Sequence, residues 1–276
     1  MDNKKLNIII NQYIPCLIEQ NILSQDDIDG LANWLKSDDY INVNRNNKPV
    51  FFMDWLISAA NNDERSLSFI HFFNDTLNKL LEDSNGAFDQ KLEQKIRNIV
   101  KCNVDHPSYL DNLSELLLQS YLIEKSSSDG YKFLGMEFDI GNGKHADFAF
   151  EKDDKIMLIE LTNIHYQKNK NLKKLLDDRF KKKLKDKTKD INEAQIYLSE
   201  KYQKKEIHLA IAIFVWEDTF KIKGRPVEIQ KVMDKYKDTL LPPITLLCQI
   251  DTDGNFDWDI CPLTEALIRC NQVKQK

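Results

Sequence analysis

The spacing of apolar residues changes between residues 108 and 215, and this change constrains the fold more than any other feature of the sequence. Residues 108–124 have helical spacing, with Glu115 inside an otherwise apolar run. Residues 132–140, 144–150 and 155–161 instead form short apolar runs with a period of two, separated by Gly141-Asn-Gly143 and Asp153-Asp154. This pattern predicts one helix followed by three strands joined by hairpin turns.

A long lysine-rich helix is expected after the third strand. Its apolar stripe contains Leu172, Leu176, Phe180, Leu184 and Ile191. Residues 207–215 are almost wholly apolar, which is typical of a buried strand. The order helix, three strands, helix, strand predicts an α/β domain.

The rest of the chain predicts helices before this core and a mixed extension after it. We assign residues 1–105 to an all-helical N-terminal region, in which Ser24 is the predicted N-cap, and residues 106–276 to the second domain. Residues 66–81 and 88–100 show amphipathic helical spacing. The predicted tail has a helix beginning near Pro226, strands over 244–250 and 256–260, and a helix from Thr264.

Charge is distributed unevenly along the chain, whose net charge is −5. From Lys168 to Lys189 ten lysines and Arg179 face three aspartates, a local balance of +8, so the remaining residues carry −13. Such a run is usually a solvated helix face, but it also suits contact with a phosphate backbone. We expect DNA or RNA to bind through this basic helix.

The cysteines and the hydropathy predict a cytoplasmic protein with no membrane segment. The five cysteines are scattered and form no CxxC pair, which indicates reduced thiols. No apolar stretch approaches the roughly 20 residues that would span a bilayer. The sequence contains neither GxxxxGK[ST] nor GxGxxG, which argues against nucleotide-driven motors.

Two acids lie at positions that a hairpin brings together. Asp147 stands near the start of the second predicted strand and Glu160 near the end of the third. In an antiparallel hairpin these positions meet, and the period of two places Glu160 and Thr162 on one face. A divalent cation relieves the repulsion of two such carboxylates, so we expect Mg²⁺ or Mn²⁺ there, able to activate water for phosphodiester hydrolysis.

With these acids, the segment resembles the PD-(D/E)xK nuclease superfamily, the restriction-endonuclease-like fold. The resemblance covers roughly 110 residues and implies an αβββαβ core with a mixed central sheet. It implies that Asp147 and Glu160 are the metal-binding and catalytic carboxylates, and that Glu115 is the further metal-binding acid that many members carry on the first helix. Restriction or anti-phage defence is the role expected by analogy.

Thr162 stands where the motif has its lysine, and a hydroxyl supplies no cation to the developing phosphate charge. Some members place this lysine on the following helix, which here begins with Lys168, Lys170, Lys173 and Lys174. Lys173 borders the sheet-facing stripe and is the expected substitute. His145 shares the strand face of Asp147 and is placed to assist.

The leading hypothesis is a metal-dependent endonuclease acting on DNA or RNA. The alternative is a catalytically silent nuclease-like domain that binds nucleic acid or protein, in an immunity or regulatory role, which Thr162 and the acidic remainder of the chain favour. The N-terminal helices are expected to recognise a target, dock a protein partner or mediate dimerisation.

Overall fold

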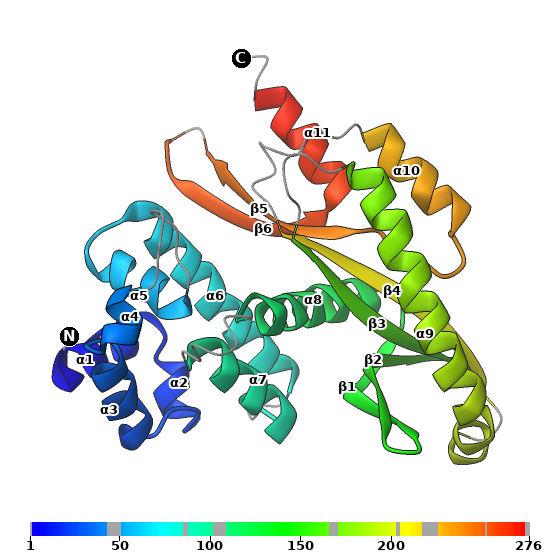
Figure 1. The fold of residues 1–276 in the computed structure, drawn as a ribbon, viewed down its shortest axis with the longest axis horizontal. Helices are drawn as coiled ribbons and strands as arrows, with labels where there is room; N and C mark the ends of the chain where they lie inside the picture. Colours follow the sequence, from blue (N-terminus) through cyan, green and yellow to red (C-terminus); the bar gives the residue numbers. More distant parts are fainter. Residues whose placement is uncertain are drawn as a thin grey trace. The chain divides into compact units, whose positions relative to one another are not determined.

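The computed structural model describes residues 2–42, 51–84, 88–101, 109–165, 171–202, 205–216, 226–251 and 253–273. In these ranges the chain forms eleven helices and a six-stranded sheet, with only helices preceding the first strand (Figure 1). The predicted mixed α/β class and the helical N-terminal region are therefore confirmed. Within the same ranges, no helix is long and apolar enough to cross a membrane.

The chain divides into two compact units. The first comprises residues 1–120 and 249–258, and the second comprises residues 121–248 and 259–276. The boundary that the sequence predicts near residue 105 lies in 102–108, outside the described residues.

Helices make up most of the first unit. They are α1 (Asn3–Tyr13), α2 (Cys16–Glu19), α3 (Gln25–Trp34), α4 (Asp38–Asn42), α5 (Phe52–Ala60), α6 (Glu64–Asp83), α7 (Gln90–Val100) and the first part of α8 (Tyr109–Ser128). The predicted cap of α3 is present: Ser24 Oγ accepts from the Asp27 N–H at 3.2 Å, and Asp27 Oδ2 accepts from the Ser24 N–H at 3.0 Å. Helices α6 and α7 match the predicted amphipathic segments.

Most of the sheet belongs to the second unit. Its strands lie in the order of the chain: β1 (Lys132–Gly141), β2 (Lys144–Lys152), β3 (Lys155–His165), β4 (Glu206–Trp216), β5 (Ile244–Ile250) and β6 (Phe256–Pro262). The pairs β1–β2 and β2–β3 are antiparallel, whereas β3–β4 and β4–β5 are parallel. The sheet is therefore mixed, and every strand predicted from the sequence is present.

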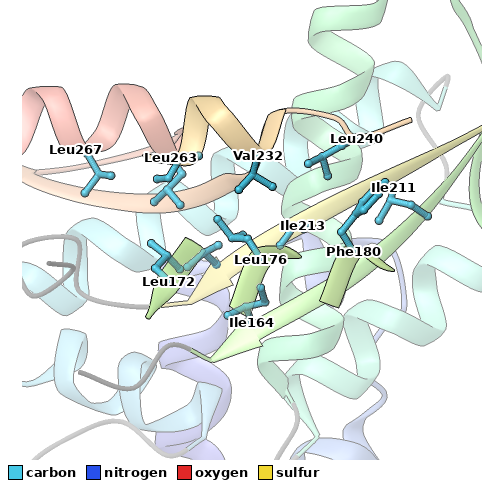
Figure 2. Close-up of a cluster of buried hydrophobic side chains, with 12 residues drawn as sticks. Ile164, Leu172, Leu176, Phe180, Ile211, Ile213, Val232, Leu240, Leu263 and Leu267 are labelled. Atoms are coloured by element: carbon cyan, nitrogen blue, oxygen red, sulfur yellow. The ribbon is translucent and has the colours of Figure 1, made fainter. Parts of the chain in front are cut away.

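Helix α9 (Leu172–Lys201) connects β3 to β4 and packs along the sheet (Figure 1). Its fully buried Leu176 and Phe180 contact the sheet residues Ile211 and Ile213, as Figure 2 shows. Helices α10 (Pro226–Lys235) and α11 (Leu263–Val273) contribute Val232 and Leu267 to the same cluster. The predicted apolar stripe of α9 thus determines which face of the helix packs against β3 and β4.

The far end of α9 is held over the β1–β2 turn. Gly141 has φ 91°, and a β-carbon there would lie 2.9 Å from the Tyr197 ring of α9. The Tyr197 hydroxyl donates to Asp139 Oδ2 at 2.8 Å. Because Gly141 leaves room for the ring, α9 contacts the sheet beyond its lysine-rich segment as well as within it.

Candidate active site

Glu160 is a buried carboxylate on the sheet face that α9 covers. It shares this face of β3 with Ile156, Leu158 and Ile164, which belong to the apolar clusters beneath the helix. Only 1 % of its side chain is exposed. A carboxylate in such surroundings requires compensation by opposite charge or by a metal.

Asp147 lies beside Glu160 on the neighbouring strand. The β2–β3 register pairs Phe148 with Ile159, and its continuation by one residue places Asp147 opposite Glu160. The side chain of Asp147 accepts a hydrogen bond from the Leu161 N–H, with Oδ2 at 2.6 Å. This bond extends the contact of the two strands past their last backbone pair, so the predicted meeting of the two acids is confirmed.

Two lysines of α9 face these acids. The Lys183 Nζ lies 2.9 Å from Glu160 Oε2 and 3.8 Å from Asp147 Oδ2. The Lys187 Nζ lies 2.9 Å from Glu160 Oε1 and 3.3 Å from the His145 carbonyl oxygen. Residues four apart lie on the same side of a helix, so both ammonium groups reach the same carboxylate.

Opposing effects act on the pKa of Glu160. Burial raises the pKa of Glu160, the neighbouring Asp147 raises this pKa further, and Lys183 and Lys187 act to lower it. Each Glu160 oxygen has an ammonium nitrogen at 2.9 Å, and both lysines lower the pKa through charge and hydrogen bonding. Carboxylate oxygens of this kind are also the ligands that hard cations take.

Lys173 is not the lysine that the structure brings to the acids. It is exposed near the start of α9, ten residues from Lys183, which is about 15 Å along the helix axis. Lys183 and Lys187 make the ion pairs with Glu160 instead. Lys168 and Lys170 lie outside the described residues.

The other predicted site residues have different surroundings. Glu115 belongs to the first unit and forms an ion pair with Lys95 of α7. The His145 side chain is exposed, and Thr162 lies on the same strand face as Glu160, two residues further along β3. Lys144 forms an ion pair with Asp190 of α9.

Sequence reasoning missed Lys183 and Lys187, although the sequence contains a signal for them. The apolar stripe of α9 runs to Leu184 and resumes at Ile191, so position 187 interrupts it with a charged residue. A lysine in the sheet-facing stripe of a helix needs a buried partner. Glu160, the only acid in the predicted strand 155–161, is that partner.

Two carboxylates, those of Asp147 and Glu160, could bind a metal ion at this site. Among the residues that the structure describes, no three His, Cys, Asp or Glu side chains are grouped so that they could hold a metal. Mg²⁺ is commonly held by one or two carboxylates, with water and substrate phosphate oxygens completing its shell. Asp147 and Glu160 fit that limited role.

Comparison with known proteins adds no relative: no protein-family model, no curated protein and no solved structure matches this chain.

Proposed function

We propose that the chain is a metal-dependent nuclease that hydrolyses phosphodiester bonds in DNA or RNA, with a PD-(D/E)xK-type core. The element order from α8 through β1, β2, β3 and α9 to β4 supports this proposal. So does the position of the acids, one on β2 and one on β3 of a mixed sheet. The bound metal would be Mg²⁺ or Mn²⁺.

The observation that carries the proposal is the convergence of Asp147, Glu160 and Lys183. A divalent ion on the two carboxylates would supply an activated water and neutralise phosphate charge. Lys183 lies within reach of both acids, so its ammonium supplies the cation that Thr162 lacks. Lys187 secures the second oxygen of Glu160, which fixes the orientation of that carboxylate.

Cleavage by the purified protein tests the proposal. Supercoiled plasmid, single-stranded DNA and RNA are incubated with Mg²⁺ or Mn²⁺, and the wild type is compared with Glu160→Gln and Asp147→Asn. Glu151→Gln is the matched control, because Glu151 also lies on β2 and pairs with a lysine, Lys205, away from the two acids. Cutting by the wild type and Glu151→Gln alone supports the nuclease. Equal cutting by all four proteins would indicate a contaminant and reject the site.

A silent nucleic-acid- or protein-binding module is the second candidate. The observation that favours it is the pairing of each Glu160 oxygen with a lysine, which neutralises the carboxylate without a metal. In that case Asp147 and Glu160 would form a structural charge cluster with Lys183 and Lys187 that joins α9 to the sheet. Mn²⁺ titration by calorimetry separates the two candidates, since a nuclease requires binding that Asp147→Asn weakens, whereas a silent module gives no heat in either protein.

A further inference from the structure

A groove runs along the side of α9 that is turned away from the site lysines, because at about 100° per residue Lys181 and Lys185 point roughly opposite to Lys183 and Lys187. It has a volume of about 790 Å³ and is lined by Lys181, Leu184, Lys185, Thr188, Lys189 and Asn192. The three lysines are exposed, whereas Leu184 is partly buried. The lining thus combines three cations, two neutral hydrogen-bonding side chains and one apolar side chain.

The spacing of these residues gives the groove a direction. Lys181, Lys185 and Lys189 recur every four residues, so they follow one another along one flank of α9 at intervals of about 6 Å. Thr188 and Asn192 lie between and beyond them on the same flank. A row of evenly spaced cations suits a linear polyanion with regularly spaced charges better than a small anion that one lysine pair could hold.

The charge around the groove is strongly one-sided. From Lys181 to Lys189 the helix contains six lysines and a single aspartate, Asp186. Lys181 is also paired with Asp177, which belongs to a contact between α9 and α10 that includes Lys235 and Tyr236. Tyr236 and Lys235 thus share Asp177 with Lys181, so this aspartate does not neutralise Lys181 alone.

We infer that this groove binds the sugar–phosphate backbone of the nucleic acid on which the proposed active site acts, at a surface of α9 separate from the acids, an inference that rests on the proposed function. The lysines at 181, 185 and 189 contact successive phosphates, and Thr188 and Asn192 hydrogen-bond to phosphate or sugar oxygens. Helix α9 then has two separate tasks. Lys183 and Lys187 face the acids beneath the helix, while the groove lysines hold the nucleic acid.

Binding without hydrolysis tests this inference. Fluorescence anisotropy is measured with labelled single-stranded DNA, duplex DNA and RNA oligonucleotides in EDTA, in a Glu160→Gln background that cannot cut. The groove variant carries Lys181→Gln, Lys185→Gln and Lys189→Gln together. The control variant carries Lys155→Gln, Lys231→Gln and Lys237→Gln, which remove the same charge from exposed positions of the second unit outside α9.

The groove variant should lose at least about tenfold in affinity at moderate salt, and its salt slope should fall by about 2 to 3, as expected for three lost phosphate contacts. The control should lose less than about threefold. Equal losses in both variants would show bulk attraction only and overturn the inference, as would undetectable binding by the parent protein. Folding of both variants is checked by circular dichroism, and single Lys185→Gln replaces the triple variant if that variant unfolds.

The same experiment separates this inference from the nuclease proposal. Specific loss of binding in the groove variant, together with no cutting by the wild type under any condition, would leave a strand-binding groove and reject the nuclease. Cutting by the wild type with unchanged binding in the groove variant would reject the groove alone.

Discussion

The Lys183 ammonium lies 2.9 Å from Glu160 and 3.8 Å from Asp147, so one cation on α9 is shared by the acids of two neighbouring strands. This contact is long-range in sequence and depends on how α9 lies across the sheet. The two acids differ in exposure, since Glu160 is buried whereas 29 % of the Asp147 side chain is exposed.

Glu160→Gln should gain stability relative to the wild type as the pH rises. The pKa of Glu160 is raised above its ordinary value of 4.5, so protonation of Glu160 stabilises the folded state relative to the unfolded state. The stability that this group contributes is present in full below pH about 4.5 and is lost as the pH rises through the raised pKa. The loss amounts to about 1.4 kcal/mol for each pH unit between the ordinary and the raised pKa. Urea unfolding of both proteins from acid to neutral pH measures the difference.

Glu151→Gln is the control for that titration. A hydrogen bond from Lys205 lowers the pKa of Glu151, so its contribution is already complete above its ordinary value of 4.5. The free-energy difference between Glu151→Gln and the wild type should therefore be flat above pH about 4.5, the range in which the Glu160→Gln difference changes. A flat difference for Glu160→Gln as well would contradict the burial of a charged Glu160.

Lys183→Gln should reduce cleavage more than Lys187→Gln. Lys183 approaches both acids, whereas Lys187 approaches only Glu160. Losing a cation next to the developing phosphate charge lowers kcat by roughly 10²-fold or more, and losing one that only orients a carboxylate should have a smaller effect, about tenfold. Steady-state cleavage of one oligonucleotide gives both values, with Lys173→Gln alongside. If Lys173→Gln caused the largest loss, the assignment of Lys183 would be wrong.

The strands and the meeting of the two acids could be predicted because both follow from short-range pattern. A period of two and a Gly-Asn-Gly turn fix a hairpin, and the hairpin fixes that Asp147 meets Glu160. Lys183 and Lys187 could not be chosen in the same way. Which lysines of α9 face the sheet depends on the rotation of the helix about its axis, and Leu176 and Phe180 set that rotation by packing on Ile211 and Ile213.

The surroundings of Glu115 show the same limit. Glu115 stands out in the sequence as a carboxylate inside an apolar helical run, and its metal-binding role is implied only by the resemblance. The structure pairs it with Lys95, from a different helix. Sequence pattern marks a charged residue as needing a partner, but the packing of helices decides which partner it has. The role of Glu115 as a metal ligand stays a prediction.

Asp27→Asn should destabilise the first unit by about 1 kcal/mol at neutral pH, allowing for solvent screening. Arg97 lies 3.0 Å and Lys101 2.7 Å from the carboxylate, which links α3 to the end of α7. Partial burial alone would raise the pKa of Asp27, but hydrogen bonds from Lys101 and Ser24 outweigh it and lower the pKa to about 2. The stability is therefore present above the ordinary value of 3.8 and lost as the pH falls toward 2.

Unfolding monitored in the acid range checks the Asp27 prediction. The difference between Asp27→Asn and the wild type should shrink steadily from pH about 5 to about 2.5. Asp26→Asn, from the same first turn of α3, is the control and should change little. A penalty for Asp27→Asn that stays constant into acid would show that the ion pairs contribute nothing and that only the cap matters.

Mn²⁺ should raise the thermal stability of the wild type, and this gain should depend on both acids. A ligand that binds only the folded state stabilises it by about 2.7 kcal/mol at a hundredfold excess over its Kd. Asp147→Asn and Glu160→Gln each leave a single carboxylate, so most of the gain should vanish, whereas Glu151→Gln should retain it. The measurement is Tm as a function of Mn²⁺ concentration, with EDTA reversing the shift.

Because the metal and the two lysines compete for the same Glu160 oxygens, Lys187→Gln should lower the Mn²⁺ concentration needed for half of the shift. An identical shift in all five proteins would place the metal elsewhere, and a shift that Lys187→Gln delays would mean that the lysine assists the metal rather than competing with it.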